Sequence, residues 1–191
     1  TATGLAAGTY FVTVTGTNGC FDSAYVVVND GLLLNASIAN TIDVSCSGDC
    51  NGQATVIAIG GSVATNYTYL WDSNAANQST ATATGLCIGT YSVTVYDDNL
   101  CFDTTSTIIT TPNPVLASLL TTNQATCNGI CDGSASVTAT GGTVLGNYSY
   151  LWPNGQTNAT ATALCAGNYQ VTIYDDNACS DTLSINITQP S

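Results

Sequence analysis

The stretch Thr90-Tyr91-Ser92-Val93-Thr94-Val95 alternates polar and apolar side chains and is followed by Asp97-Asp98-Asn99. Alternation among β-branched and aromatic residues predicts a half-buried β-strand. Tyr91, Val93 and Val95 then share the buried face of that strand. Aspartate and asparagine favour turns, so the strand is expected to end in a tight reversal. The stretch therefore predicts one arm of an antiparallel pair in an all-β fold.

The same pattern occurs three times along the chain. Gly-Thr-Tyr-x-Val-Thr-Val begins at Gly89 and at Gly8, and a variant begins at Gly167. The cysteines repeat as well. The step from Cys20 to Cys101 is 81 residues, and the step from Cys101 to Cys179 is 78. A period near 80 residues indicates complete domains in a row, because solenoid repeats have periods of about 20–50 residues.

The boundaries follow from this alignment. Pro112 and Pro190 hold equivalent positions, where a short linker is expected. The three-residue difference between repeats lies between Trp71 and Cys87 and is assigned to a loop. The predicted domains are the end of a truncated first repeat at 1–30, a second repeat at 31–111 and a third repeat at 112–191.

Each repeat contains a series of short strand patterns. In the second repeat these include residues 53–58, 67–71, 90–95 and 101–109. About seven short strands at this spacing predict an immunoglobulin-like antiparallel β-sandwich, so the chain is expected to be tandem sandwiches arranged as beads on a string. Trp71 is expected in the core of the second sandwich, and Tyr91 is placed where a tyrosine corner would lie.

The composition excludes several functions. The chain has 12 acidic residues and no lysine, arginine or histidine. Nucleic acid is therefore not expected as a partner, because phosphate binding needs basic residues. Schiff-base and histidine-assisted nucleophilic chemistry lack their residues, and no glutamate is present to serve as the acid of a glycosidase. We expect a protein that is not an enzyme and uses no cofactor.

The chain also lacks an apolar run of about 18 residues, so direct membrane insertion is not expected. It has no signal-peptide pattern and no initiator methionine, and we interpret it as a mature or partial segment. Nine cysteines without histidine indicate disulfides formed in an oxidising compartment. A four-thiolate zinc site is the competing interpretation, which the spacing from Cys46 to Cys50 disfavours.

The combined motifs resemble a known family, the SprB repeat. The resemblance rests on Gly52-Gln53-Ala54-Thr55-Val56, Gly60-Gly61, Tyr67-x-Tyr69-x-Trp71, Gly85-Leu86-x-x-Gly89-Thr90-Tyr91-x-Val93-Thr94-Val95 and Asn99-x-Cys101, and on their counterparts in the other two copies. It implies very long surface adhesins of gliding Bacteroidota that are exported by the type IX secretion system. The family repeat usually has two cysteines, which match Cys46 and Cys101, so Cys50 and Cys87 are an added pair.

The expected topology predicts two disulfides. The loop before the second strand and the loop before the sixth strand lie at the same pole of an immunoglobulin-like sandwich. Cys50 and Cys87 occupy these loops, as do Cys131 and Cys165 in the third repeat. We therefore predict the pairs Cys50–Cys87 and Cys131–Cys165, each contributing about 3–4 kcal/mol.

The partners of the remaining cysteines stay open at this point. Cys46 and Cys101 are expected at opposite poles, about 20 Å apart for a six-residue strand, which is too far for a bond within one repeat. Cys46 could instead face Cys179 of the next repeat, which would leave Cys20 and Cys127 to pair outside this chain. The alternative is a Cys46–Cys101 bond within the repeat.

Two further sets of side chains are candidate sites. Ser23, Thr104 and Thr182 each follow an aspartate, and the triplet resembles the O-glycosylation sequon of exported Bacteroidota proteins. Ordinary strand composition is the alternative. The second set could bind Ca²⁺ through carboxylate oxygens, although turn residues are the favoured interpretation. It comprises Asp97, Asp98, Asp175 and Asp176.

The sequence thus predicts an extracellular, cell-surface structural protein with a mechanical or spacer role. Its expected partners are neighbouring repeats or copies of the same protein. The alternative is a binding module whose tyrosine-rich faces, including Tyr96 and Tyr174, hold surface glycans. Residues 1–30 either belong to a repeat with further sequence upstream or complete a neighbouring subunit by strand addition.

Overall fold

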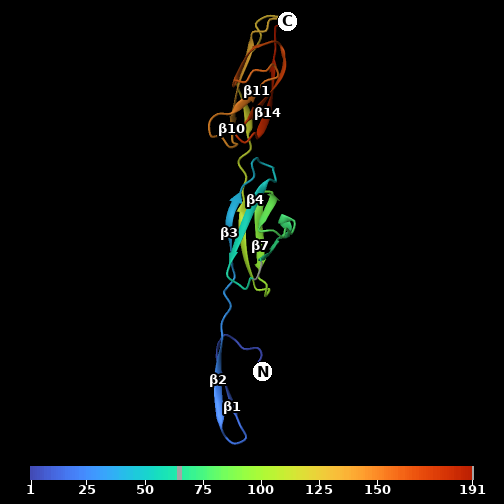
Figure 1. The fold of residues 1–191 in the computed structure, drawn as a ribbon. Helices are drawn as coiled ribbons and strands as arrows, with labels where there is room; N and C mark the ends of the chain where they lie inside the picture. Colours follow the sequence, from blue (N-terminus) through green and yellow to red (C-terminus); the bar gives the residue numbers. More distant parts are fainter. Residues whose placement is uncertain (64–65, 191) are drawn as a thin grey trace.

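The computed structural model describes residues 1–63 and 66–190, and within them the protein is all-β with strands in antiparallel sheets. Figure 1 shows three bodies in line: an N-terminal hairpin, a middle sandwich and a C-terminal sandwich. The hairpin consists of β1 (Gly8–Thr15) and β2 (Phe21–Val28). Tandem immunoglobulin-like sandwiches, as predicted from the strand patterns, are therefore the architecture of the chain.

Two three-stranded sheets face each other in the second repeat. One has the order β3-β4-β6 and the other the order β5-β7-β8. Their bounds are Asn35–Ile42 (β3), Gly52–Ile59 (β4), Thr68–Trp71 (β5), Thr82–Leu86 (β6), Gly89–Tyr96 (β7) and Phe102–Ile109 (β8). This pairing joins the first, second and fourth strands of the repeat in one sheet and the third, fifth and sixth in the other, as in the two facing sheets of an immunoglobulin-like sandwich.

The third repeat has the same strand order. Its sheets are β9-β10-β12 and β11-β13-β14. Their bounds are Leu116–Asn123 (β9), Gly133–Thr140 (β10), Ser149–Leu151 (β11), Thr160–Leu164 (β12), Gly167–Tyr174 (β13) and Ser180–Ile187 (β14).

Each sandwich has its own core around one tryptophan. Trp71 is fully buried in the second repeat, and its indole Nε1 donates a hydrogen bond to the Thr80 carbonyl at 2.9 Å. Trp152 does the same in the third repeat, with the Asn158 carbonyl as acceptor at 2.9 Å. The first core draws on residues 36–109 and the second on residues 115–187. Apolar burial therefore stabilises each repeat separately.

The tyrosine corner expected at Tyr91 is present. The Tyr91 hydroxyl donates to the carbonyl of Cys87 at 3.0 Å. Tyr169 makes the same bond to Cys165 at 3.1 Å, and Tyr10 in the hairpin bonds to Ala6 at 2.8 Å. The recurring tyrosine therefore fixes the turn that leads into each of the strands β1, β7 and β13.

The expected number of seven strands per repeat is wrong, because six strands are present in the described part of each. After Trp71 the chain forms the predicted loop, which contains a 3₁₀ turn at Ser73–Ala75 that the Asp72 side chain caps. The Trp71 N–H then donates to Gln78. The third repeat closes the same connection sooner, with Trp152 N–H donating to Gln156. The three-residue difference lies in this loop, as the alignment predicts.

Paired glycines end β4 and β10 where the linker crosses close to the sheet. Gly60 has φ +80°, and a Cβ there would lie 2.0 Å from the Leu33 carbonyl oxygen. Gly141 has the same geometry against Pro114. Only glycine accommodates this approach, so the linker entering each repeat has a fixed path over the sandwich.

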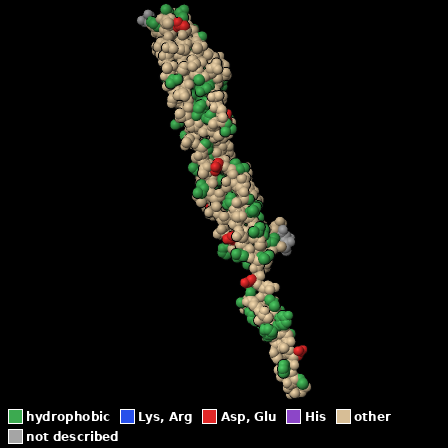
Figure 2. Space-filling view, turned by 90° about the vertical axis from the view of Figure 1, so that its left-hand side faces the viewer, with side chains coloured by type: hydrophobic (Ala, Val, Ile, Leu, Met, Phe, Trp, Pro, Cys, Tyr) green, Lys and Arg blue, Asp and Glu red, His purple; other side chains and the backbone are tan. Residues whose placement is uncertain are grey.

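The hairpin β1–β2 has no opposing sheet within the described residues. Val12 and Val14 are 58% and 69% exposed, whereas their counterparts Val93 and Val95 in β7 are fully buried. The space-filling view shows hydrophobic side chains gathered on this thin end of the molecule (Figure 2). The hairpin is thus two strands of a sandwich whose inner face is open.

Candidate functional site at the junction between repeats

A disulfide between Cys46 and Cys179 joins the second repeat to the third. The S–S distance is 2.04 Å, the two Cα atoms are 5.5 Å apart, and 133 residues separate them in sequence. The bond between repeats that the sequence allowed is therefore the one present, and the alternative bond from Cys46 to Cys101 is wrong. The physical reason is the one anticipated: the two cysteines of one sandwich lie at opposite poles.

Cys46 is presented by a short loop after β3. The carbonyl of Cys46 accepts a hydrogen bond from Asp49 N–H at 3.1 Å, and Gly48 takes φ +93° to close the turn. The side chain of Asn51 accepts from Ser45 N–H at 2.9 Å. We call residues 46–50 the Cys46 loop; the equivalent Cys127 loop comprises residues 127–131.

Cys179 is presented by the turn between β13 and β14. The buried carboxylate of Asp175 accepts hydrogen bonds from Asn177 N–H and Cys179 N–H at 2.9 and 2.8 Å. Its second oxygen accepts from Thr143 N–H at 2.7 Å. One aspartate thus ties the cysteine to the segment after β10 and holds it in place before the disulfide forms.

A shallow groove at the junction is lined by both repeats, and we call it the junction groove. The Cys46 loop contributes Cys46 and Ser47, and the third repeat contributes one wall from the linker and one from the turn. These walls are Asn113, Pro114 and Val115 and Ala178, Cys179 and Ser180. The Asn177 side-chain Nδ2 also donates to the Ser45 carbonyl at 3.3 Å. The covalent bond is therefore accompanied by a polar contact between the two repeats.

Both disulfides predicted within the repeats are also present. Cys50 is bonded to Cys87 and Cys131 to Cys165, closing loops of 37 and 34 residues. Cys50 ends the Cys46 loop, so the bond between repeats and the bond within the second repeat share one short segment. Three cysteines are exposed thiols in this structure: Cys20, Cys101 and Cys127.

The turn aspartates that were weak calcium candidates accept hydrogen bonds from backbone N–H groups. Asp97 is buried and accepts from Ser62, Asn99 and Cys101, and the bond from Ser62 is the main reason that the pKa of Asp97 lies below its ordinary value of 3.8. Asp176 accepts from Leu145 and Gly146 N–H groups. Among residues 1–63 and 66–190, no group of three or more cysteine or aspartate side chains could hold a metal ion.

Ser23, Thr104 and Thr182 are all exposed, so their hydroxyls are accessible for modification. The aspartates that precede the two threonines have a structural role that the sequence did not reveal. Asp103 accepts from Ala36 N–H at 2.8 Å, and Asp181 accepts from Ala117 N–H at 2.8 Å. Each bond joins the last strand of one sheet to the first strand of the other.

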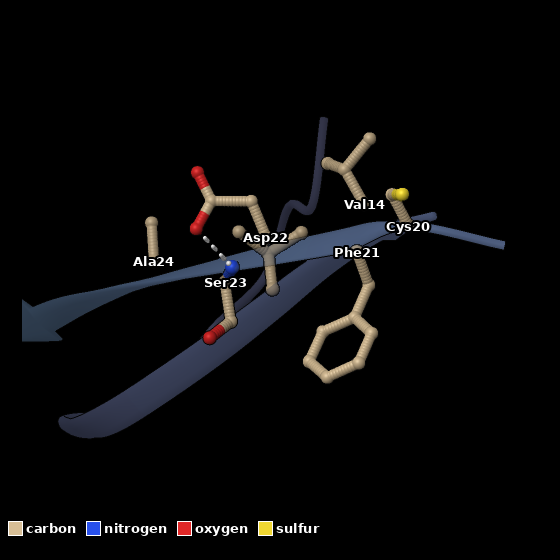
Figure 3. A pocket seen from close by; sticks show the side chains of 7 residues that line it. Val14, Cys20, Phe21, Asp22, Ser23 and Ala24 are labelled. Carbon is tan, nitrogen blue, oxygen red and sulfur yellow. Dashed lines mark hydrogen bonds between the residues drawn. The ribbon is translucent and has the colours of Figure 1, made fainter. Parts of the chain in front are cut away.

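In the hairpin, the equivalent aspartate has no opposing strand. Figure 3 shows Asp22 and Ala24 on one side of β2 and Phe21 and Ser23 on the other, with Asp22 accepting from Ser23 N–H. Asp22 therefore lies on the face that is covered in the other repeats. The recurrence of aspartate before serine or threonine has a structural cause in β8 and β14, independent of glycosylation.

A sequence profile of the SprB repeat matches residues 38–76 and 119–157. The SprB repeat is therefore matched by one segment in each of the two sandwiches. The matched segments run from the middle of β3 and β9 past the tryptophan, and the strands that follow complete each sandwich. Thus the Cys46 and Cys127 loops lie within the SprB segments, whereas Cys179 lies in the following part of its sandwich.

Solved structures show a distant likeness that concerns the fold alone. Three N-terminal domains of the bacteriophage RB49 outer capsid protein Hoc are 15% identical, with a TM-score of 0.46, over 83% of this chain and 59% of that one. Immunoglobulin domains 1–5 of Sidekick-1 are 12% identical, with a TM-score of 0.35, over 96% of this chain and 46% of that one. The chain thus spans about half the length of these structures. No curated protein matches the SprB-containing chain.

Residues 1–63 and 66–190 form no helix of the length and hydrophobicity that a membrane span requires.

Proposed function

We propose that the chain is a load-bearing structural segment of an extracellular surface adhesin or filament. The observation that carries this proposal is the Cys46–Cys179 disulfide. Tension applied along the row of sandwiches enters the second repeat and leaves the third, and this bond connects the two covalently. Both cores lie largely inside the 133 residues that the bond spans. Tension applied at the two ends of the chain is therefore carried by the bond and does not act on most of the core strands.

The remaining disulfides support the same role. Cys50–Cys87 and Cys131–Cys165 each close a loop within one sandwich. A cross-link of this length stabilises a domain by about 3–4 kcal/mol, chiefly by restricting the unfolded chain. Three disulfides in a chain of this size are typical of proteins that work in an oxidising, extracellular environment.

The surface chemistry fits exposure outside a cell. The chain offers no lysine or arginine, so trypsin-like proteases have no cleavage site. A net charge of −12 gives no attraction to anionic polymers. The SprB repeats relate the chain to surface adhesins of gliding Bacteroidota. We infer that neighbouring repeats or copies of the same protein are its main contacts, and that Ser23, Thr104 and Thr182 carry O-linked glycans.

A second candidate function is binding of surface glycans. It is favoured by one observation on the second repeat, where the rings of Tyr96 and Phe102 lie 5.9 Å apart on the outer face of the β5-β7-β8 sheet. Phe102 is exposed and Tyr96 is half-buried, and aromatic rings present flat apolar surfaces on which a sugar could pack. The counterpart of Phe102 in the third repeat is Ser180, so this pair is not repeated. Glycan-array binding by the chain that is lost in Phe102→Ser would favour this function.

Small-angle X-ray scattering in solution tests the structural role. A load-bearing segment predicts the scattering of a stiff, elongated particle, with the second and third repeats in a fixed line. The matched variant is Cys46→Ser/Cys179→Ser, which removes only the bond between repeats and is expected to broaden the distribution of angles between them. A compact particle, or identical scattering from both proteins, would contradict the proposal.

A further inference from the structure

The junction groove, where the Cys46 loop meets the third repeat, has a counterpart on the second repeat that is lined by that repeat alone. Leu32, Leu33 and Leu34 form its linker wall, and Cys101 and Phe102 form its turn wall. These positions correspond to Asn113, Pro114 and Val115 and to Cys179 and Ser180 of the junction groove. The groove on the second repeat is also apolar at its surface, because Leu32, Leu33 and Phe102 are 76%, 86% and 66% exposed.

The backbone of the two grooves is the same in detail. Asp97 accepts from Cys101 N–H at 2.9 Å, as Asp175 accepts from Cys179 N–H at 2.8 Å. The residues before the two cysteines, Leu100 and Ala178, both adopt positive φ, at 62° and 64°. Gly61 N–H donates to Leu32 and Gly142 N–H donates to Asn113, at 2.9 and 2.8 Å. Cys101 is therefore presented in the geometry that forms a disulfide one repeat further along.

We propose that the groove beside Cys101 is a docking site for the Cys46-type loop of a preceding SprB-type repeat, closed by a disulfide to Cys101. Two thiols are oxidised in this step. Cys101 and the loop cysteine each lose a hydrogen atom, and an external disulfide such as oxidised glutathione accepts both and becomes two thiols. The exposed leucines and Phe102 lose contact with water when the loop is seated. This inference rests on the proposed role as a tandem array.

The two loops of the docking kind in this chain, the Cys46 loop and the Cys127 loop, have the same backbone form. The Cys127 loop repeats the geometry of the Cys46 loop: Ile130 N–H donates to the Cys127 carbonyl at 3.2 Å, and Asp132 accepts from Thr126 N–H at 2.9 Å. Cys127 is thus the loop cysteine of a further junction, at the far pole of the third repeat, as Cys46 is the loop cysteine of the bond to Cys179. The two kinds of cysteine are complementary, one on a loop and one in a groove, so pairing is expected only between unlike kinds.

Disulfides of this kind at every junction would give an array a short covalent path, which runs from one disulfide to the next and avoids most of each repeat. With both junctions closed, tension would leave one disulfide at Cys101 and reach the next at Cys127, only 26 residues later. Most of that path consists of β8 and β9, which are extended strands already. Because a strand rises about 3.3 Å per residue, close to the limit of a stretched chain, unfolding a repeat would add little length.

A longer chain tests the docking site directly. Residues 1–30 are replaced by a second copy of residues 31–111, which contains a complete core, and the protein is folded with oxidised and reduced glutathione. Non-reduced peptide mapping by mass spectrometry is expected to find Cys46 of the added copy bonded to Cys101 of the following repeat. Alkylation is then expected to modify two cysteines per chain, Cys101 of the added copy and Cys127. The matched control, with Cys46→Ser in the added copy, is expected to leave the following Cys101 open to alkylation.

The other bonds in the same protein report on folding. Formation of Cys50–Cys87 in the added copy shows that it has folded, and formation of Cys46–Cys179 shows that conditions allow a bond between repeats. If both form while Cys101 remains a thiol, or bonds to a cysteine other than Cys46 of the added copy, the docking proposal is overturned. The structural role would survive that result, because it rests on the Cys46–Cys179 bond and fails only if the repeats are not held in line.

Discussion

The carboxylate of Asp103 accepts a hydrogen bond from the backbone N–H of Ala36 at 2.8 Å, across 67 residues of sequence. Asp103 lies in β8 and Ala36 in β3, so the bond joins the two sheets of the second repeat at their shared edge. The other carboxylate oxygen accepts from Thr104 N–H at 2.8 Å. In the third repeat Asp181 and Ala117 make the same connection.

Asp103→Ala should therefore destabilise the second repeat. It removes a charged acceptor from two backbone donors, and hydrogen bonds to charged groups contribute about 1.5–3 kcal/mol. Urea denaturation followed by fluorescence measures the loss, in a Trp152→Phe background where only Trp71 reports. Asp22→Ala is the matched control, since Asp22 has no opposing strand, and it should leave the transition unchanged. Equal effects of the two substitutions would refute the role assigned to Asp103.

Removal of the Cys50–Cys87 bond should lower the stability of the second repeat alone. A closed loop of 37 residues is worth about 3–4 kcal/mol through restriction of the unfolded chain. Cys50→Ala/Cys87→Ala should shift the Trp71 transition to lower urea and leave the Trp152 transition in place. Cys131→Ala/Cys165→Ala should do the reverse. A shift of both transitions by either pair would show that the repeats do not unfold independently.

The tyrosine corner should contribute less than a disulfide but measurably. Tyr91→Phe removes the hydroxyl that donates to Cys87 and leaves the buried ring in place. The expected loss is about 1 kcal/mol, the usual net value of a neutral hydrogen bond. Tyr10→Phe makes the same change in the open hairpin and should not move the Trp71 transition. No change in the Tyr91 variant, measured by the same urea titration, would contradict the assignment.

Acid should destabilise the protein. Hydrogen bonds from Thr110, Ser62 and Thr126 hold the pKa values of Asp43, Asp97 and Asp132 below the ordinary 3.8. The unfolded chain then binds protons at a higher pH than the folded chain, so stability is complete above the unfolded pKa and is lost as pH falls through the folded values. No histidine is present, so stability should be nearly flat from about pH 5 to 7.5.

The measurement is the urea midpoint at several pH values in 0.15 M salt. Protonation also relieves repulsion between the aspartates, which would stabilise the folded chain, and a screening length of about 8 Å at this salt concentration weakens that effect. The chain supplies its own control variant. Gln124 occupies in the third repeat the position of Asp43, and its side-chain oxygen accepts from Thr188 N–H as Asp43 accepts from Thr110 N–H. Asp43→Gln should therefore reduce the acid sensitivity of the second repeat. A midpoint that rises on acidification would contradict the account.

Much of this architecture could be predicted because the repeat carries redundant signals. Alternation placed Tyr91, Val93 and Val95 on the buried face, and the two tryptophans identified one core in each repeat. The pairing of Cys50 with Cys87 followed from the order of strands alone. The Cys46–Cys179 bond could be named only as one of two alternatives, because its choice depends on how consecutive sandwiches are placed.

Other features lie outside the reach of sequence patterns. The 3₁₀ turn at Ser73–Ala75 lies in the predicted loop and is capped by the Asp72 side chain, and such a local hydrogen bond is not visible in hydrophobic periodicity. The role of Asp103 depends on a contact across 67 residues. The groove beside Cys101 is recognised as an incomplete junction only when its counterpart between the second and third repeats is seen.

Forced extension of single molecules, held at their two ends, tests most directly whether the Cys46–Cys179 bond carries load past both cores. The oxidised chain should release only the segments outside the bond, because the 133 residues between the two cysteines are shielded. Cys46→Ser/Cys179→Ser should release about 62 of those residues as well, because the Cys50–Cys87 and Cys131–Cys165 bonds still close loops of 37 and 34 residues. This adds about 200–220 Å of stretched chain less the folded length. Equal extension of the two proteins would contradict the load-bearing account.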